Sequence, residues 1–462
     1  MNNGAIIILG ATGDLTKRKL IPALYRLFEN GKLTNGALLG AALEDSDAQT
    51  IVQRSHEYIE GVNPTVWQHF CERFFYQQAD FTDALAMDRL AERALALEKE
   101  FHLSGNRIVY CATAALYYCP ITKHAASSGL VRKSDSSGRW HRIVYEKPFG
   151  HDLASAHAIN ECIAQNFDET QIYRIDHYLT KELVSNIALV RFTNCIFEPL
   201  WNNRYIDQVH IVLSETQGID GRGAYYDNYG ALRDVVQNHM LELLALVAME
   251  SPAKLTGEYI RTERARVLQK IVFVDGILGQ YNGYRSEKQV APDSRIDTAA
   301  YLYLRVNNPR WAGVPFFLKT GKCLDRKETT IYIKFKQVDC LLTRFCPSES
   351  NSLTIQIAPQ SVFSFNINAK KPGYSDQTIP IKMEFCHSCL YGPTSTEAYE
   401  VLFEEILRGE QSICVRFDEI EYAWQLIDTI SQQHVPMYQY EKQTEGPVQI
   451  YDFARKHGMR WR

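Results

Sequence analysis

Residues 5–19 read AIIILGATGDLTKRK, and this stretch decides the fold of the first part of the chain. The run from Ala5 to Leu9 is apolar and β-prone, which is typical of a buried strand. Gly10 and Gly13 follow in a tight turn, and leucines then recur at helical spacing. A strand, a glycine turn and a helix N-terminus together form an anion site, because backbone N–H groups and the helix dipole converge there. The stretch therefore predicts the dinucleotide-binding turn of a Rossmann domain.

Strand and helix patterns continue to alternate through the first 175 residues. Apolar runs at 37–42, 107–112 and 142–146 predict further strands, and residues 83–101 have the pattern of a helix. This alternation is typical of a doubly wound parallel sheet with helices on both faces. We therefore predict an α/β Rossmann domain over residues 1–175.

The pattern changes in the second part of the chain. Apolar and polar residues alternate with period two at 207–214, 299–306, 329–336 and 353–357. Such alternation predicts an antiparallel sheet with one covered face. Helical patterns at 234–249 and 397–408 are expected to cover that face. We predict a larger α+β domain over residues 176–462, built on a mostly antiparallel sheet.

Composition limits the classes of function. The chain has 462 residues, 45% of them hydrophobic, and 50 basic against 54 acidic residues give a net charge of −4. This balance gives no general attraction to nucleic acid or to an anionic membrane, so any phosphate site must be a local basic cluster. No targeting or membrane-spanning segment is visible.

The cysteines indicate a reducing compartment. Their number is 11, odd, and they are scattered along the chain. This argues against a disulfide framework and for a cytoplasmic protein. The single pair Cys386 and Cys389 lacks a second pair at metal-ligand spacing, so we interpret it as packing, with metal or redox use as the alternative.

A second motif, RIDHYLTKE at 174–182, carries a candidate phosphate site. His177 and Lys181 are four residues apart, so a helix that starts near Thr180 would place them on one face, beside Tyr178. A cation, an imidazole and a phenol at a helix start can bind a phosphate group. From these residues alone, a structural role for His177 remains the alternative.

These motifs resemble those of the glucose-6-phosphate dehydrogenase family. The matching blocks, in order along the chain, are GATGDLTKRKLIPAL, EKPFG, RIDHYLTKE, FEPLWNNRYID, GALRDVVQNH and RWAGVPFFLKTGKCLDRK. The resemblance implies an oxidoreductase that oxidises C1 of a hexose 6-phosphate, such as glucose 6-phosphate. The product would be the 6-phospho-lactone, with hydride transfer to NAD or NADP, and Pro148 is a candidate for a cis peptide bond. The partners it implies are a sugar phosphate and a second copy of the chain, in a homodimer through the large sheet.

The resemblance also assigns roles to individual residues. It implies that His239 is the catalytic base and that Asp176 orients it; the apolar helix around His239 would favour a neutral imidazole. The substrate-binding residues would be His177, Tyr178, Lys181, Lys147, Glu215, Asp234, Lys322 and Lys327. The coenzyme-binding residues would be Gly10, Thr12, Gly13, Asp14, Leu15, Lys19, Glu44 and Lys147. No metal is required, because the proton and the hydride both have destinations.

The sequence departs from the family at three places. Leu43 stands where NADP-using members carry an Arg, and Glu44 follows it, which predicts a preference for NAD unless Glu44 points into solvent. Ala358 stands where a Gln would contact the sugar, and 112–114 lacks a family Pro. An altered sugar, such as a 2-amino-2-deoxyglucose 6-phosphate, is therefore one alternative. A regulatory paralogue without catalysis is the other.

Overall fold

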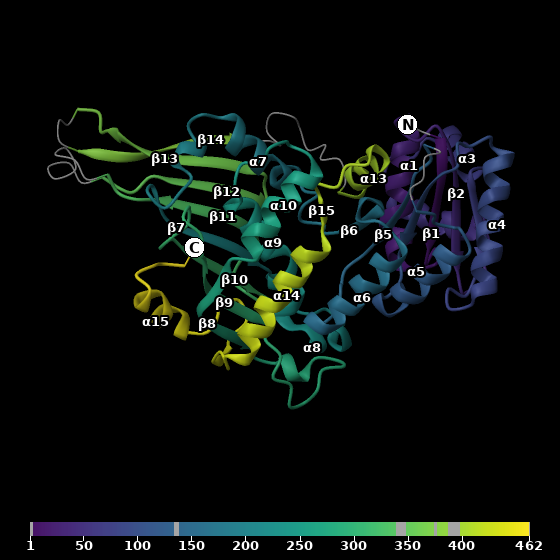
Figure 1. Ribbon diagram of the computed structural model, residues 1–462. Helices are drawn as coiled ribbons and strands as arrows, with labels where there is room; N and C mark the ends of the chain where they lie inside the picture. The colour runs from purple at the N-terminus through teal and green to yellow at the C-terminus, as the bar shows by residue number, and fades with distance from the viewer. Residues whose placement is uncertain (1–2, 134–137, 339–347, 374–376, 387–397, 462) are drawn as a thin grey trace. The chain divides into compact units, whose positions relative to one another are not determined.

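The computed structural model describes residues 3–133, 138–338, 348–373, 377–386 and 398–461 (Figure 1). The chain divides into two compact units. Unit 1 comprises Met1–Thr180, Lys254–Arg261 and Thr396–Phe417. Unit 2 comprises Lys181–Ala253, Thr262–Ser395 and Asp418–Arg462.

Unit 1 is built on one sheet with the strand order β15-β6-β5-β4-β1-β2-β3. Its strands are β1 (Asn3–Leu9), β2 (Asn35–Ala42), β3 (Phe74–Gln78), β4 (Asn106–Cys111), β5 (His141–Tyr145), β6 (Ile172–Ile175) and β15 (Cys414–Val415). All neighbours pair in parallel except β15, which pairs antiparallel with β6. The predicted doubly wound parallel sheet is confirmed.

Helices connect these strands. They are η1 (Thr16–Leu20), α1 (Ile21–Glu29), α2 (Ala48–Ser55), η2 (His56–Tyr58), α3 (Pro64–Cys71), α4 (Ala84–Glu100), η3 (Ala115–Tyr117), α5 (Tyr118–Ser127), α6 (Leu153–Asn166), η4 (Glu169–Gln171) and α13 (Ala398–Arg408). Ile7, Ile8 and Leu9 of β1 are fully buried. Burial of both faces of the sheet explains why this strand reads as a continuous apolar run.

The position of helix α13 corrects one prediction. The pattern at 397–408 was expected to cover the antiparallel sheet, and residue 397 lies outside the described residues. Instead α13 packs in unit 1, where the ring of Phe403 lies 5.6 Å from that of Tyr110 on β4. The Arg142 guanidinium of β5 donates a hydrogen bond to the Ile406 carbonyl. An amphipathic pattern says that a helix has an apolar face, but not which sheet will cover it.

A disulfide corrects a second prediction. Cys119 of α5 and Cys162 of α6 are bonded, with 5.9 Å between their Cα atoms. Cys386 is also disulfide-bonded, so its interpretation as packing is wrong, and Cys389 lies outside the described residues. Cysteine number and spacing could not reveal that the helices carrying these two cysteines, which are 43 residues apart, pack together.

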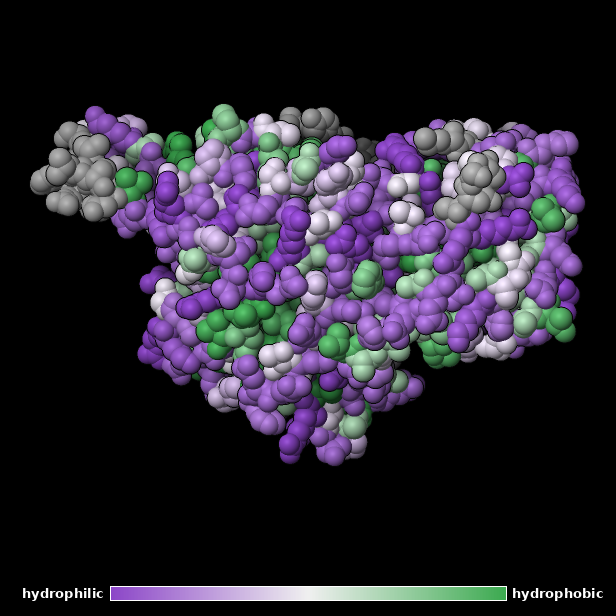
Figure 2. Space-filling model, viewed as in Figure 1, coloured by the Kyte–Doolittle hydropathy of each residue, from purple (hydrophilic) through white to green (hydrophobic). Residues whose placement is uncertain are grey.

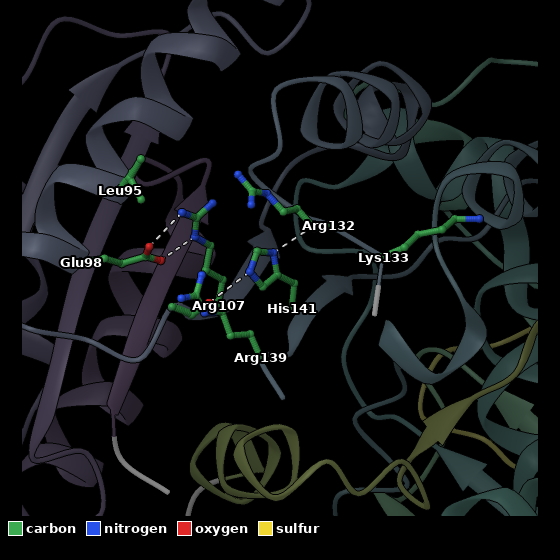
Figure 3. A pocket seen from close by; sticks show the side chains of 8 residues that line it. Leu95, Glu98, Arg107, Arg132, Lys133, Arg139 and His141 are labelled. Atoms are coloured by element: carbon green, nitrogen blue, oxygen red, sulfur yellow. Dashed lines mark hydrogen bonds and ion pairs between the residues drawn. The ribbon is translucent and has the colours of Figure 1, made fainter. Parts of the chain in front are cut away.

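A small cavity of about 90 Å³ opens at the amino ends of β4 and β5 (Figure 3). Its wall includes a buried ion pair in which Arg107 Nε and Nη2 donate to the two carboxylate oxygens of Glu98, at 2.6 and 3.0 Å. Beside it, His141 Nδ1 accepts from the Arg132 backbone N–H at 3.0 Å. Burial, followed by the Arg107 charge, lowers the pKa of His141 to about 4. The cavity therefore lies at the sheet edge opposite to the glycine turn.

Unit 2 is built on a second sheet with the order β14-β13-β12-β11-β7-β10-β9-β8-β16. Its strands are β7 (Ile206–Ser214), β8 (Ile271–Tyr281), β9 (Ala299–Val306), β10 (Pro315–Gly321), β11 (Glu328–Phe335), β12 (Ser352–Ala358), β13 (Val362–Lys370), β14 (Thr378–Cys386) and β16 (Met437–Tyr440). Only the β7–β10 and β8–β16 pairs in the described sheet are parallel. The predicted, mostly antiparallel sheet is confirmed.

Helical segments pack with this sheet, and α9 and α14 cross its viewed face in Figure 1. The segments are α7 (Glu182–Thr193), η5 (Glu198–Leu200), α8 (Gly223–Ala231), η6 (Leu232–Met240), α9 (Leu241–Ala248), α10 (Gly257–Leu268), η7 (Tyr284–Ser286), α14 (Phe417–Gln432) and α15 (Gln449–Lys456). The predicted helix at 234–249 is present, but its first part, η6, is a π-helix. All residues of α9 are buried, as its apolar sequence predicts.

The surface is largely polar. Figure 2 shows hydrophilic residues over most of the viewed face. Among the described residues, no helix is both long and apolar enough to cross a lipid bilayer.

Candidate active site

The candidate site residues of unit 1 follow the carboxyl ends of its parallel strands. Gly10 comes directly after β1, Glu146 after β5 and Asp176 after β6. Because these strands run in parallel, their carboxyl ends share one edge of the sheet, where doubly wound folds bind their ligands.

The glycine turn is shaped for a close approach by a ligand. Gly10 has a φ of +96°, and a Cβ placed there would lie 2.3 Å from the Ala112 carbonyl oxygen, so only glycine fits. The Gly10 and Ala11 N–H groups donate to the Ala41 carbonyl at 2.8 and 3.0 Å, which fixes the turn to β2. The Thr16 hydroxyl donates to the Gly10 carbonyl at 3.0 Å and ties the turn to the helix that follows.

Glu44 is held at this turn. The Thr12 hydroxyl donates to its Oε2 at 2.7 Å. That hydrogen bond lowers the pKa of Glu44, so the side chain is a carboxylate at neutral pH. Leu43 beside it is 63% exposed. Glu44 is itself exposed, so its orientation toward a coenzyme stays a prediction.

The other candidate coenzyme residues lie on the first turns after the glycines. Asp14 is exposed and accepts from Arg18 Nε at 2.7 Å, while Leu15 is half-buried. Lys19, the last candidate on these turns, is exposed. Lys17, which is not a candidate, forms an ion pair of 3.2 Å with Glu57.

A buried carboxylate organises the candidate phosphate site. Glu146 is 7% exposed, and its Oε2 lies 3.2 Å from His177 Nε2. The hydroxyls of Tyr110 and Tyr399 both donate to its Oε1. The Tyr399 hydroxyl also lies 3.2 Å from His177 Nε2. Burial alone would lower the pKa of His177, but the hydrogen bond and charge of Glu146 outweigh it and raise that pKa. The imidazole is thereby favoured as a cation.

The local chain at His177 differs from the prediction. Residues 177–180 form turns, Lys181 has extended backbone angles (φ −69°, ψ 128°), and α7 begins only at Glu182. His177 and Lys181 therefore do not share a helix face. The reason is Asp176, whose Oδ1 accepts from the Tyr178 backbone N–H at 2.8 Å. This side-chain bond competes with helical pairing of the backbone. Lys147, from the loop after β5, precedes a cis peptide bond to Pro148, as predicted.

Unit 2 brings two of its candidate substrate residues into contact. Lys322 is only 4% exposed, and its Nζ donates to Glu215 Oε2 at 2.5 Å. The same ammonium lies 5.7 Å from the centre of the Tyr226 ring. The neighbouring Tyr225 hydroxyl donates to Asp234 Oδ1 at 3.1 Å. Acidic, basic and phenolic groups therefore gather at the start of η6.

His239 and Lys327 occupy contrasting environments. His239 lies near the end of η6 and is 6% exposed, which fits the expected desolvation. Lys327 is exposed on the loop between β10 and β11. Asp176 belongs to unit 1 and His239 to unit 2, so their pairing stays a prediction. Among the described residues, no cluster of three His, Cys, Asp or Glu side chains could hold a metal ion.

Sequence reasoning missed three residues of this arrangement. Glu146 could have been suspected, because it ends a predicted strand and begins the EKPFG motif. Tyr399 carried no signal, because it lies more than 200 residues from His177 in the chain. Tyr225, part of a tyrosine-rich segment, has no motif of its own.

We expect Glu146→Gln to lower the pKa of His177. The neutral amide removes the charge that now favours the imidazolium. Because the folded-state pKa is raised, this pair stabilises the fold below the unfolded pKa, and the contribution is lost as pH rises through the folded value. NMR titration of the His177 ring would measure the change. Tyr399→Phe is the control, since it keeps the carboxylate and should leave the pKa raised. An unchanged pKa in Glu146→Gln would show that Glu146 is not the cause.

Comparison with known proteins places the chain in a family. The model described as "Glucose-6-phosphate dehydrogenase, NAD binding domain" matches residues 7–186, and that described as "Glucose-6-phosphate dehydrogenase, C-terminal domain" matches residues 188–462. The chain is 37% identical to glucose-6-phosphate 1-dehydrogenase of Chlamydia pneumoniae, over 99% of this chain and 95% of the relative. It is also 37% identical to that of Bacillus subtilis (strain 168), over 99% of this chain and 97% of the relative.

A solved structure agrees over the whole chain. It is described as glucose-6-phosphate dehydrogenase in complex with its substrate glucose-6-phosphate. The TM-score is 0.92 at 30% identity, and the match covers 100% of this chain and 99% of the other. The prediction of a dehydrogenase with this fold is confirmed, and the chain belongs to the glucose-6-phosphate dehydrogenase family.

Proposed function

We propose that the protein oxidises C1 of glucose 6-phosphate, or of a close analogue, to the 6-phospho-lactone. The observation that carries this proposal is the full-length match to relatives of that name, combined with a buried His239 and the RIDHYLTKE motif. Coenzyme binding and phosphate binding are assigned to polar groups at the carboxyl edge of unit 1. Proton abstraction is assigned to η6 of unit 2.

The coenzyme fits the glycine turn. Gly10 presents no Cβ there, and Glu44 is anchored to the same turn through Thr12. We propose that Gly10, Thr12, Gly13, Asp14, Leu15, Lys19 and Glu44 hold the dinucleotide, with Lys147 between it and the sugar. When bound, the nicotinamide supplies the hydride acceptor.

The remaining residues bind and orient the sugar phosphate. A cationic His177, Tyr178 and Lys181 would bind the 6-phosphate, since charge-assisted hydrogen bonds to phosphate are stronger than neutral ones. Glu215, Asp234, Lys322 and Lys327 would position the sugar. His239 takes the proton of the C1 hydroxyl, and Asp176 holds the imidazole in the correct tautomer.

We expect His239→Asn to lower kcat by at least about 10²-fold with little change in substrate affinity, because a general base acts mainly in the transition state. Coenzyme reduction followed spectrophotometrically with glucose 6-phosphate measures this. His210→Asn is the matched control, because His210 is another buried histidine of unit 2 and has no proposed role. Near wild-type turnover in His239→Asn would remove this residue from the mechanism.

The sugar itself is a narrower question. Ala358 ends β12, so a methyl group stands where the resemblance expects a sugar-contacting amide. Because that contact is absent, both glucose 6-phosphate and 2-amino-2-deoxyglucose 6-phosphate should be assayed as substrates. The substrate with the higher kcat/KM is the one the site selects.

We further propose that NAD is preferred over NADP. The ionised Glu44, held at the turn by Thr12, would accept hydrogen bonds from the ribose hydroxyls of NAD. It would also repel a 2′-phosphate. Two unit charges about 4 Å apart interact by roughly 4 kcal/mol at an effective dielectric near 20, and by less when exposed to salt. Leu43 offers no compensating charge.

We expect the double change Leu43→Arg, Glu44→Gln to move the ratio of kcat/KM towards NADP by at least about tenfold, equivalent to about 1.4 kcal/mol. Initial rates with each coenzyme below its KM measure this ratio. Asp45→Asn is the control, since it removes an exposed carboxylate next to the proposed one. If the wild-type enzyme has the higher kcat/KM with NADP, the assignment of Glu44 is wrong.

We propose that the substrate-binding part, residues 176–462, also forms a homodimer through its large sheet, and that residues 1–175 form the coenzyme domain. Edge strand β14 exposes Ile381, Met383 and Phe385 by 38%, 52% and 42%. Their spacing of two places them on one face of the strand. Exposed apolar rows on edge strands are typical of interfaces.

A cytoplasmic location is proposed from relatives of Arabidopsis thaliana and Solanum tuberosum that are named as cytoplasmic.

We expect Met383→Glu to raise the dimer dissociation constant by at least about tenfold, because a charge would have to be buried in an apolar contact. Sedimentation or light scattering over a dilution series measures this. Lys382→Glu is the matched control, since its side chain points to the other face of β14. Equal dissociation constants in the two variants would contradict an interface on this face.

A further inference from the structure

A second cavity, of about 670 Å³, lies within unit 2 and contains none of the candidate catalytic or substrate residues. We call it the arginine cavity. Its lining residues are Leu232, Arg233, Leu278, Arg285, Arg295, Ile296, Asp297, Ile430, Ser431, His434, Val435, Met437 and Gln439. They come from the start of η6, from β8, η7 and β16, from the end of α14, and from the loop before β9.

The cavity concentrates positive charge in a chain whose net charge is −4. Its lining includes three arginines and one histidine, but one carboxylate, that of Asp297. Asp297 is buried and already engaged, because its Oδ2 accepts from the Leu232 backbone N–H at 2.8 Å. Within the described part of the chain, none of the three guanidiniums forms an ion pair with a carboxylate. The Arg233 charge acts on the carboxyl of Asp297, and the charges of Arg285 and Arg295 are available to an anion.

A buried amide holds the arginine-bearing segments in place. Gln280 of β8 is 1% exposed. Its Nε2 donates to the Ser294 and Ile296 carbonyls, at 3.1 and 3.0 Å, on both sides of Arg295. Its Oε1 accepts from Arg285 Nε at 3.2 Å. One fixed side chain thus anchors the Arg285 guanidinium and the backbone that carries Arg295, which lowers the entropy cost of binding a ligand.

The remaining wall is apolar. Leu278 of β8 pairs in register with Met437 of β16, and Ile430 and Val435 lie in the same lining. The volume is within the range of small-molecule sites, which combine apolar walls with a few convergent polar groups. Arginine recognises phosphate oxygens through its planar set of donors. We propose that the arginine cavity is a regulatory site for a phosphate-bearing metabolite of nucleotide size.

The cavity has a direct structural connection to η6. Leu232 and Arg233 line it, and the next residue is Asp234, a candidate sugar ligand. Asp297 anchors this start of η6 through the Leu232 N–H, and its carbonyl accepts from the Ala231 N–H at 2.8 Å. An anion that contacts Arg233 acts on the segment that also carries His239. Occupancy therefore changes turnover without competing for the sugar.

Calorimetric titration with ADP and with inorganic pyrophosphate tests the binding. We expect Arg285→Ala, Arg295→Ala in one chain to weaken both ligands by at least about tenfold. Arg204→Ala, which removes another exposed arginine of unit 2, is the control and should bind as the wild type does. Met437→Trp should weaken ADP more than pyrophosphate, because it fills the apolar wall and leaves the arginines. Equal affinities in the wild type and the double variant, or no binding of either ligand, would overturn the proposal.

A kinetic measurement tests the regulation and rests on the proposed function. ADP should change kcat at saturating coenzyme and sugar phosphate in the wild type and in Arg204→Ala. The double variant should lose this response while retaining its basal turnover. An ADP effect that only raises the KM for the coenzyme, equally in all variants, would place the ligand in the coenzyme site and contradict a regulatory cavity. The calorimetric result does not depend on activity, so the two failures are distinguishable.

Discussion

The Glu146 carboxylate is the interaction on which the carboxyl edge of unit 1 depends. It accepts hydrogen bonds from Tyr110 of β4 and Tyr399, next to the start of the described α13, and it faces His177 after β6. A buried carboxylate is costly unless its oxygens are satisfied. These partners satisfy it, and its charge in turn raises the pKa of His177. One acidic side chain therefore fixes three segments and also favours a cation where the phosphate of the substrate is proposed to bind.

Both segments that carry the proposed chemistry contain a π-helix. η1 follows the glycine turn, and η6 carries Asp234 and His239. A π-helix pairs its backbone through i→i+5 hydrogen bonds, and such segments are rare but occur frequently at functional sites. In η6 the irregular start is anchored by Asp297, whose own pKa is raised to about 6 by burial.

Charge in this protein is local. A net charge of −4 hides three local groupings: His177 with its raised pKa beside Glu146, the Lys322–Glu215 pair, and the arginine cavity. In the first two places each cation has an acidic partner, which keeps it oriented before a ligand arrives. In the arginine cavity the Gln280 amide oxygen accepts from Arg285 and the Asn228 carbonyl accepts from Arg233, so uncharged groups orient these two guanidiniums. That difference separates the residues proposed to position the sugar phosphate from the cavity proposed to bind an anion.

The sequence by itself determined the two sheets, the glycine turn and the candidate residues, because these depend on short-range patterns. A buried strand can be predicted from its apolar run alone. Gly10 is required by its own φ of +96°. The residues of each motif are neighbours in the chain and are recognised together. The tertiary structure alone decided that Tyr399 meets His177, that α13 packs on unit 1 and that Cys119 bonds Cys162. The physical reason is that contacts between distant segments follow from how whole faces pack, and local periodicity does not encode which faces meet.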